Sequence, residues 1–488
     1  MTQHRKKTKI VATLGPASSS KETIKAMIDA GVNVFRINFS HADYQDVEER
    51  IKIIRDLNSE FDYHTAILAD LQGPKLRVGV MEDGIVVKAG DRISFYTGER
   101  FVGNHEKAYM NYPQFPSDVK PGERILLDDG KLIFEVESTD GTAKVDAKVV
   151  QGGPLKSNKG VNLPNTKISL PALTPKDLKD ADFAIKQQVD WIALSFVRNE
   201  DDLKELQAII KAKSAIKIPI IAKIEKPEAI VNIDKIVAHC DGMMVARGDL
   251  GVEMPAAEVP LIQKQLVHRA KRARIPVIIA TQMMETMIDS LTPTRAEVND
   301  VANSVMDGAD AVMLSGETSV GQYPVQVIQK MSEILKSVEH SDLIQVPQLA
   351  PQIRTNRYIT KSVCYHAATM ANEIDAKAIS TLTNSGYTAF QISAWRPHAH
   401  ILVFSSNRRI LNRLSLLWGV EVFFYEKFVS TDETVDDLNL LACKAGYLDE
   451  GDMLISLAAM PIKEKGMVNT LRVSEITGEI MKLAGRAR

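Results

Sequence analysis

One pattern recurs eight times in this chain: a short, almost continuously apolar run is followed by a stretch with helical spacing of apolar and charged residues. The runs are 9–15, 32–40, 65–72, 190–196, 218–227, 240–249, 275–284 and 310–317. Such runs are typical of parallel strands buried on both faces. Eight strand-and-helix units most simply form an α/β fold of the closed (β/α)₈ type, the TIM barrel, with a doubly wound open sheet as the alternative. No GxGxxG fingerprint follows any run, which favours the barrel.

The alternation is interrupted once, after the third run. Residues 74–168 are instead rich in Val and Ile and contain Asp-Gly turns, a pattern that indicates β-hairpins. We therefore expect a small β-barrel domain inserted into a barrel made of residues 1–73 and 169–345. Residues 346–488 carry their own alternating strands and helices and predict a separate C-terminal α/β domain.

The first helix has clear start and stop signals. Ser19 and Glu22 have the spacing of a capping box, and Gly31 is a typical helix terminator. The sequence therefore predicts a helix between these two points.

The charge balance excludes several classes of partner. Lysine and arginine number 60 and aspartate and glutamate 62, a net charge of −2, so nothing indicates binding to nucleic acid or to an anionic membrane surface. No apolar run reaches membrane-spanning length, and the run behind the basic amino terminus is too short for a signal peptide. Three widely spaced cysteines without CxxC spacing argue against a disulfide framework or a zinc site. We expect a cytoplasmic protein.

Six of the predicted strands end in polar or charged side chains. In a (β/α)₈ barrel these carboxyl ends form the face on which chemistry occurs. A single such residue is more often solvated or structurally paired, but agreement among six strands predicts an active site. The residues are Arg36, Asn38, Ser40, Asp70, Lys223, Glu225, Arg247, Asp249, Thr281, Gln282, Ser315 and Glu317.

Glu225 and Asp249, on neighbouring strands, indicate a metal site. Carboxylate oxygens without His or Cys suit Mg²⁺ rather than zinc, and two ligands leave positions for substrate and water. Lys223 lies on the same strand face as Glu225, and Arg36 adds a guanidinium suited to phosphate or carboxylate. A structural ion network is the alternative. The residues alone predict a Mg²⁺-dependent enzyme that acts on a small phosphorylated or carboxylated anion.

Several longer stretches can be compared with known families: TKIVATLGPAS, FRINFSH, DLQGPKLR, NKGVNLP, KIEKPEA, MVARGDLGVE, ATQMMETM, PTRAEVNDVAN and DGADAVMLSGETSVGQYP. Together they resemble the pyruvate kinase family, and the resemblance covers essentially the whole chain. It implies transfer of the phosphoryl group of phosphoenolpyruvate to ADP, giving pyruvate and ATP. Mg²⁺ would be required, and Mn²⁺ could replace it.

The resemblance assigns catalytic roles. Glu225 and Asp249 would hold the Mg²⁺, and Lys223 would stabilise charge on the transferring phosphoryl group and on the enolate. Arg36 would bind phosphate, and Thr281 would lie near the face at which the enolate is protonated. The implied substrate-binding residues are Arg36, Lys223, Gly248, Asp249 and Thr281.

The resemblance also implies that the inserted domain closes over the nucleotide as a lid. Such closure would exclude water, which competes with ADP for the phosphoryl group. The implied nucleotide-binding residues are Asn38, Phe39, Ser40, His41, Arg77 and Lys159.

A monovalent-cation site is implied as well. In the family K⁺ is held by the residues that match Asn38, Ser40, Asp70 and the Leu71 carbonyl. K⁺-dependent members usually carry Glu at the position of Lys75. A lysine here reverses the charge, and its ammonium is close to K⁺ in charge and size, so we expect Lys75 to serve this site and K⁺ not to be strictly required.

The C-terminal domain contains a candidate effector loop within residues 381–389. Thr383, Asn384, Ser385, Gly386 and Thr388 resemble the family loop that cradles a phosphate with hydroxyls and backbone amides. Tyr387 stands where related sequences often carry Arg. The resemblance implies a regulatory domain that binds a phosphorylated activator, and a homotetramer; a plain surface turn is the alternative for the loop.

Two other functions stay open from the sequence. Another Mg²⁺-dependent enolate enzyme, such as an aldolase or lyase, could use the same carboxylates and Arg, although it needs no nucleotide lid. The third possibility is a non-catalytic sensor built on an inactive barrel, which the full set of expected residue types argues against.

Overall fold

The predicted barrel is present. The computed structural model describes residues 5–40, 42–341, 357–427, 431–460 and 467–486. Eight parallel strands close in the order β1-β16-β15-β14-β13-β12-β3-β2. They are β1 (Lys9–Thr13), β2 (Val34–Asn38), β3 (Ala66–Asp70), β12 (Trp191–Leu194), β13 (Ile220–Ile224), β14 (Gly242–Ala246), β15 (Val277–Ala280) and β16 (Ala311–Leu314). The predicted fold class is confirmed, and the open-sheet alternative is wrong.

The strands are buried on both faces, as their apolar runs require. Along β1, Val11 packs into the barrel interior, whereas Ile10 and Ala12 pack against the surrounding helices. This alternation follows from the two-residue period of a strand. It leaves only the two ends of the barrel for polar side chains.

Helices surround the barrel. They are α1 (Lys21–Ala30), α2 (Tyr44–Phe61), α4 (Pro175–Lys186), α5 (Glu200–Lys213), α6 (Pro227–Val231), α7 (Ile233–His239), α8 (Arg247–Glu253), α9 (Val259–Ala273), α10 (Arg295–Asp307), α11 (Gly316–Ser319) and α12 (Pro324–Glu339), with short 3₁₀ turns η1 (Pro16–Ser18) and η2 (Glu285–Ile288). The predicted end of α1 at Gly31 is confirmed, with φ of 124°. The predicted cap at Ser19 is wrong by one residue, because Ser20 accepts the Thr23 N–H at 3.2 Å.

The insert folds around its own apolar core. Its six-stranded sheet has the order β11-β7-β8-β9-β5-β6, a half-barrel. The elements are β5 (Arg92–Tyr96), β6 (Lys107–Tyr109), β7 (Arg124–Leu127), β8 (Leu132–Thr139), β9 (Lys144–Gln151) and β11 (Val161–Asn162), with the pair β4 (Val86–Val87) and β10 (Gly153–Pro154) and the short helix α3 (Phe115–Asp118). Phe95 packs edge-on against Phe115 and Phe134, with ring centroids 6.2 and 5.4 Å away.

The C-terminal region forms a five-stranded sheet of order β19-β18-β17-β20-β21, in which β21 runs antiparallel to β20. Its elements are α13 (Tyr358–Glu373), β17 (Ala378–Leu382), α14 (Tyr387–Ala394), β18 (His400–Ser405), α15 (Arg408–Leu414), β19 (Val420–Phe424), α16 (Thr431–Lys444), β20 (Met453–Ala458), β21 (Thr470–Glu475) and α17 (Gly478–Leu483). β17 lies between β18 and β20, so the chain reverses its direction of sheet growth there. Open α/β sheets bind ligands at such a switch point.

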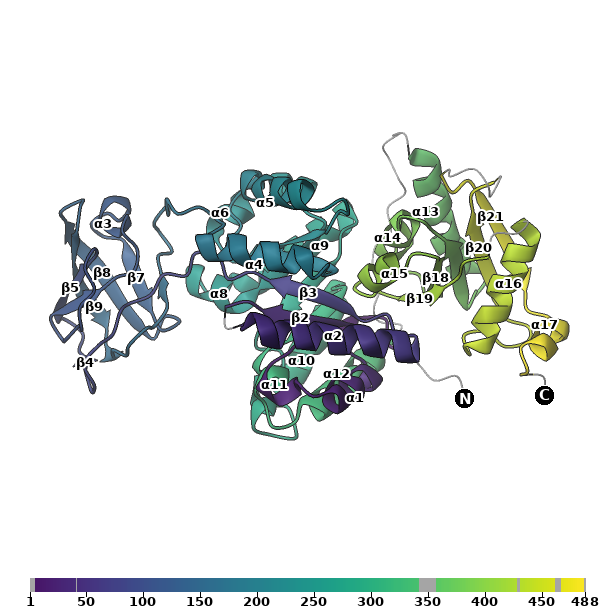
Figure 1. Ribbon diagram of the computed structural model, residues 1–488, viewed down its shortest axis with the longest axis horizontal. Coiled ribbons are helices and arrows are strands. Elements are labelled where there is room, and N and C mark those ends of the chain that lie inside the picture. The colour runs from purple at the N-terminus through teal and green to yellow at the C-terminus, as the bar shows by residue number, and fades with distance from the viewer. Residues whose placement is uncertain (1–4, 41, 342–356, 428–430, 461–466, 487–488) are drawn as a thin grey trace.

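The three parts lie in a row, with the barrel between the insert and the C-terminal sheet (Figure 1). The insert leaves the barrel after β3, at the carboxyl ends of the strands. The predicted boundaries at 73/74 and 168/169 remain predictions, and the boundary at 345/346 lies outside the described residues. Within the described part of the chain, no helix is long and apolar enough to cross a membrane.

The C-terminal sheet closes the floor of the barrel. Leu416, only 1% exposed, belongs to the same apolar cluster as the barrel interior residues Val11 and Trp191. The Trp191 indole N–H donates to the Arg413 carbonyl at 3.3 Å. An ion pair of 3.0 Å joins Arg396 to Asp310, at the start of the last barrel strand. Apolar and charged contacts therefore fix the C-terminal sheet to the barrel.

We expect Leu416→Ala to lower the free energy of unfolding by about 3 kcal/mol, because it leaves a cavity beneath the barrel. The exposed Leu261→Ala on α9 is the control and should change it by less than about 0.5 kcal/mol. Urea unfolding followed by tryptophan fluorescence measures both, since Trp191, Trp395 and Trp418 contact residues across this interface. Equal effects of the two substitutions would contradict the role of Leu416.

Candidate active site

A buried carboxylate stands at the mouth of the barrel between two cations. Asp70, at the end of β3, is 1% exposed. Its Oδ2 accepts from Arg36 Nε at 2.7 Å, and its Oδ1 lies 3.1 Å from Lys223 Nζ. Burial alone would raise the pKa of Asp70, but Lys223 and Arg36 outweigh it and hold the pKa below the usual aspartate value. Three of the predicted site residues thus form one connected group.

Lys223 is held by oxygens on three strands. Its ammonium donates to Ser195 Oγ at 2.7 Å and lies 3.1 Å from both Asp70 and Glu225. Burial would lower the pKa of Lys223, but the two carboxylates raise it well above the usual lysine range. The side chain is therefore a fixed positive charge at the barrel mouth, suited to stabilising negative charge.

Glu225 and Asp249 supply the two carboxylates at the ends of β13 and β14. Glu225 is 1% exposed and accepts the Phe196 N–H at 2.8 Å, while Asp249 lies in the first turn of α8. Burial and then Asp249 raise the pKa of Glu225, against the effect of Lys223. A bound dication would relieve this unfavourable burial. The described residues contain no group of three or more His, Cys, Asp or Glu that could hold a metal ion, so a metal bound by Glu225 and Asp249 would need further ligands.

Thr281 sits on a strained turn after β15. Thr281 and Gln282 have φ of 74° and 54°, a left-handed conformation that β-branched residues rarely adopt. The Thr281 hydroxyl accepts the Gly248 N–H at 2.7 Å and donates to the Ala280 carbonyl at 2.5 Å. The Arg247 guanidinium donates to the Thr281 carbonyl at 2.8 Å. Arg247 thus helps to hold this turn in place.

The predicted nucleotide residues come from the barrel and the insert. Arg77 and Lys159 lie side by side in the insert, where Arg77 pairs with Gly160 in an isolated bridge and donates to the Asn158 carbonyl at 2.9 Å. Lys159 forms an ion pair of 2.9 Å with Asp128. Asn38 ends β2, Phe39 and Ser40 follow it, and His41 lies outside the described residues.

The residues predicted for the cation site lie at and just after the ends of the neighbouring strands β2 and β3. The Asn38 Oδ1 accepts the Ser40 N–H at 3.2 Å, and the Leu71 carbonyl accepts from Ser195 Oγ at 2.7 Å. Lys75 is exposed and lines a crevice with Glu253 and with Asp249, one of the two predicted metal-binding carboxylates. Throughout the described chain, no hydrogen bond or ion pair joins Lys75 to Asp70, whose cationic partners are Arg36 and Lys223.

Comparison with known proteins decides the family. Residues 5–328 match the family "Pyruvate kinase, barrel domain", and residues 361–474 match "Pyruvate kinase, alpha/beta domain". The chain belongs to the pyruvate kinase family. It is 41% identical over 490 residues to a pyruvate kinase of Geobacillus stearothermophilus, covering 99% of this chain and 83% of that protein. It is also 41% identical to a pyruvate kinase of Corynebacterium glutamicum, covering 98% and 99%.

A solved structure supports the same assignment. The crystal structure of a pyruvate kinase from Cryptosporidium parvum superposes with a TM-score of 0.88 at 32% sequence identity, covering 97% of each chain. The barrel, the half-barrel insert and the C-terminal sheet therefore make up the fold of a pyruvate kinase family member.

Two residues at the barrel mouth were missed by the sequence analysis. Ser195 bonds Lys223 and follows β12, and Thr13 ends β1 and accepts from Arg36 Nη1 at 3.0 Å. Thr13 and Ser195 lie at the carboxyl ends of β1 and β12, so the same strand-end rule finds them. Glu317, by contrast, is structural: it accepts the Met284 and Ser315 N–H groups at 3.2 and 2.7 Å.

A polar contact joins the insert to the barrel. Glu253 Oε1 accepts from Asn162 Nδ2 of the insert at 2.8 Å and from the buried Lys226 at 2.6 Å. No spacing pattern links residues 91 positions apart, so the sequence could not reveal this contact.

The candidate effector loop follows β17 at the switch point of the C-terminal sheet. The Gly386 N–H donates to Thr383 Oγ1 at 2.9 Å, and Gly386 has φ of 79°, a conformation that favours glycine. Thr383 and Thr388 are buried. The ring of Tyr387 lies 4.3 Å from the guanidinium carbon of Arg357. A cation from another segment therefore lies beside Tyr387, the residue that stands where related sequences often carry Arg.

Proposed function

We infer that this chain transfers the phosphoryl group of phosphoenolpyruvate to ADP, giving pyruvate and ATP. The observation that carries the inference is the position of the Lys223 ammonium, 3.1 Å from both Asp70 and Glu225 at the mouth of a pyruvate kinase family barrel. A preorganised charge in a water-poor site stabilises the charge that develops on a transferring group.

A divalent metal fits the remaining groups. Glu225 and Asp249 are hard oxygen donors on adjacent strands, and the raised pKa of Glu225 reflects a buried carboxylate that a dication would stabilise. We propose that they hold Mg²⁺, with Mn²⁺ as a substitute. When bound, the metal supplies Lewis-acid stabilisation of the substrate oxygens.

Side chains of the barrel would bind the substrate and stabilise the charge that develops on it. Arg36 would bind the phosphoryl oxygens, since its Nε is fixed by Asp70 and its Nη1 by Thr13. Lys223 would stabilise the phosphoryl group in transfer and the enolate that remains. Thr281 and Gly248 would contact the substrate, with the Thr281 hydroxyl near the face at which the enolate gains its proton.

The nucleotide would enter between the barrel and the insert. Arg77 and Lys159 of the insert, with residues 38–41 of the barrel, would bind its phosphates when the insert closes as a lid. Closure keeps water from the phosphoryl group. An aldolase or lyase has no use for such a lid, so the insert supports the kinase over these alternatives.

Compartment and assembly remain proposals. Cys240, Cys364 and Cys443 are buried and unpaired, which suits the reducing cytoplasm. We propose a homotetramer, as the family resemblance implies.

Allosteric activation by a phosphorylated metabolite is proposed for the loop 383–388. Its support is the location at a sheet switch point, the small hydroxyl side chains and the nearby Arg357.

Independence from K⁺ is proposed for Lys75, which is four residues beyond Leu71 in the segment that leads to the insert. Lid closure would have to bring its ammonium to Asp70, because the two are not in contact here. Two cations about 4 Å apart repel by ~4 kcal/mol at an effective dielectric near 20, so K⁺ and a nearby Lys75 exclude each other.

The activity is tested by coupled assay of ATP formation from phosphoenolpyruvate and ADP. We expect Lys223→Met to lower turnover by about a hundredfold or more, since one stabilising charge is typically worth ~3 kcal/mol. Lys211→Met, on the exposed side of α5, should leave turnover unchanged. A loss below tenfold in Lys223→Met would remove that residue from its role.

We expect Asp249→Ala to raise the Mg²⁺ concentration for half-maximal activity at least about tenfold.

Activation is tested with a panel of sugar phosphates and nucleoside monophosphates. We expect at least one to lower the half-saturating concentration of phosphoenolpyruvate. Ser385→Asp should abolish that response without changing the basal rate, because a carboxylate repels the phosphate. A flat response to the whole panel would rule out the effector loop.

The role of Lys75 is tested in buffers in which tetramethylammonium replaces K⁺. We expect substantial activity without K⁺, and we expect Lys75→Glu to make activity rise when K⁺ is added. Strict K⁺ dependence of the unmodified enzyme, or an unchanged response in Lys75→Glu, would refute the proposal.

A further inference from the structure

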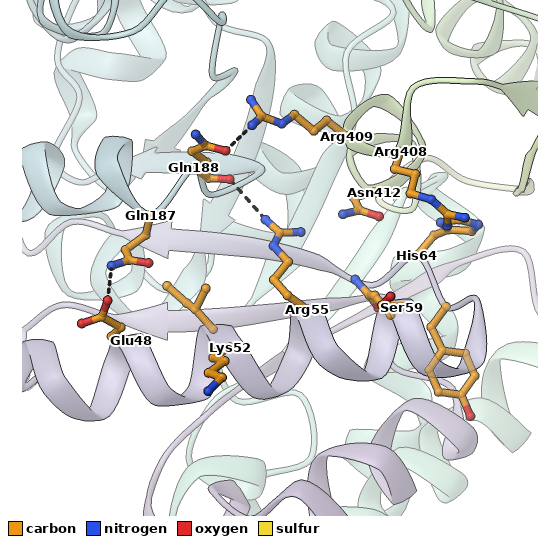
Figure 2. Close-up of a pocket in the computed structure, with 13 residues that line it drawn as sticks. Glu48, Lys52, Arg55, Ser59, His64, Gln187, Gln188, Arg408, Arg409 and Asn412 are labelled. Atoms are coloured by element: carbon orange, nitrogen blue, oxygen red, sulfur yellow. Dashed lines mark hydrogen bonds between the residues drawn. The ribbon is translucent and has the colours of Figure 1, made fainter. Parts of the chain in front are cut away.

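A cavity of about 560 Å³ lies between the barrel and the C-terminal sheet, away from both the barrel mouth and the effector loop. Its walls come from α2, from the turn after α4 and from the start of α15 (Figure 2). It shares no lining residue with the effector loop at 383–388. Its volume is that of a typical small-molecule site.

The cavity has an excess of positive charge. Lys52, Arg55, Arg408 and Arg409 line it, against a single acid, Glu48, which accepts from the Gln187 amide at 3.1 Å. Two of the cations have their own carboxylates behind the wall: Arg55 lies 3.0 Å from the buried Asp190, and Arg408 lies 2.9 Å from Asp62. Among the described residues, Lys52 and Arg409 have no carboxylate partner.

Two guanidinium groups from different domains converge on one glutamine. Arg55 of the barrel donates to the Gln188 carbonyl at 3.2 Å, and Arg409 of α15 donates to the side-chain oxygen of Gln188 (Figure 2). Gln188 has φ of 54°, so the turn that presents both oxygens is in the left-handed conformation. A neutral amide oxygen is a weaker acceptor for a guanidinium than an anion is, because an ionised acceptor makes a hydrogen bond shorter and stronger. A phosphate would therefore displace the Gln188 side chain from Arg409.

Uncharged side chains make up the rest of the walls, some of them polar and two, Ile51 and Tyr63, largely apolar. Ser59, Gln187 and Asn412 line the cavity and offer hydroxyl and amide groups that match the hydroxyls of a polyol. We propose that this cavity is a second anion site, which binds a small phosphorylated polyol through Arg409 and joins the barrel to the C-terminal domain.

His64 provides a reporter in the same wall. Burial lowers the pKa of His64; the charge of Arg408 lowers it further, and Asp62 opposes both. A dianion bound in the cavity adds negative charge beside this imidazole and raises its pKa.

The test is a titration of the full chain with glycerol 3-phosphate in a Ser385→Asp background, which blocks the effector loop. Binding is followed by NMR of the His64 imidazole, identified as the signal lost in His64→Asn. We expect this signal to shift with saturation and its pKa to rise. We expect Arg409→Gln to weaken binding at least about tenfold and Lys330→Gln, an exposed charge on α12, to leave it unchanged.

Three outcomes would overturn the proposal: no shift of the His64 signal, equal affinities in Arg409→Gln and Lys330→Gln, or inorganic phosphate binding as tightly as glycerol 3-phosphate. The NMR readout does not depend on turnover, so the proposed anion site is tested independently of the proposed kinase activity.

Discussion

The carboxylate of Asp70 is the shared counterion on which the barrel mouth depends. Arg36 and Lys223 both approach it, at 2.7 and 3.1 Å, in a place that water scarcely reaches. Two cations buried this closely would repel strongly without an anion between them. The backbone of Asp70 also accepts the Phe39 N–H at 3.0 Å, and the chain leaves for the insert a few residues later. One residue thus positions the side chains of Arg36 and Lys223 and lies just before the segment that leads to the insert.

Much of this arrangement could be predicted because parallel strands place their carboxyl ends on one face. The apolar runs located all eight barrel strands, and reading the residue types at six strand ends found Asp70, Lys223 and Glu225, which do meet. The same rule applied to the other two strands yields Thr13 and Ser195. The capping error of one residue at Ser19 has a local cause: three consecutive serines offer equivalent oxygens, and only the backbone geometry selects Ser20.

Contacts between distant segments could not be predicted, because no periodicity encodes them. Leu416 fills the barrel floor, Asn162 of the insert reaches Glu253, and Arg409 reaches Gln188, each across a large sequence separation. Lys75 illustrates the same limit. Its charge reversal is visible in the sequence, but its surroundings depend on how the insert is oriented, and in this arrangement it lines a crevice with Asp249 and Glu253.

Backbone strain marks the tightly held part of the barrel mouth. Phe196 and Thr281 have φ of 54° and 74°, each at a cost of about 1–3 kcal/mol. Surrounding contacts hold them: the Phe196 N–H is bound to Glu225, and the Thr281 carbonyl to Arg247. On the insert side, Glu253 holds Asn162 through one hydrogen bond of 2.8 Å. A segment with few such contacts opens at low cost. The strained backbone at the barrel mouth is therefore held by Glu225 and Arg247, whereas the contact between Asn162 of the insert and Glu253 is a single hydrogen bond.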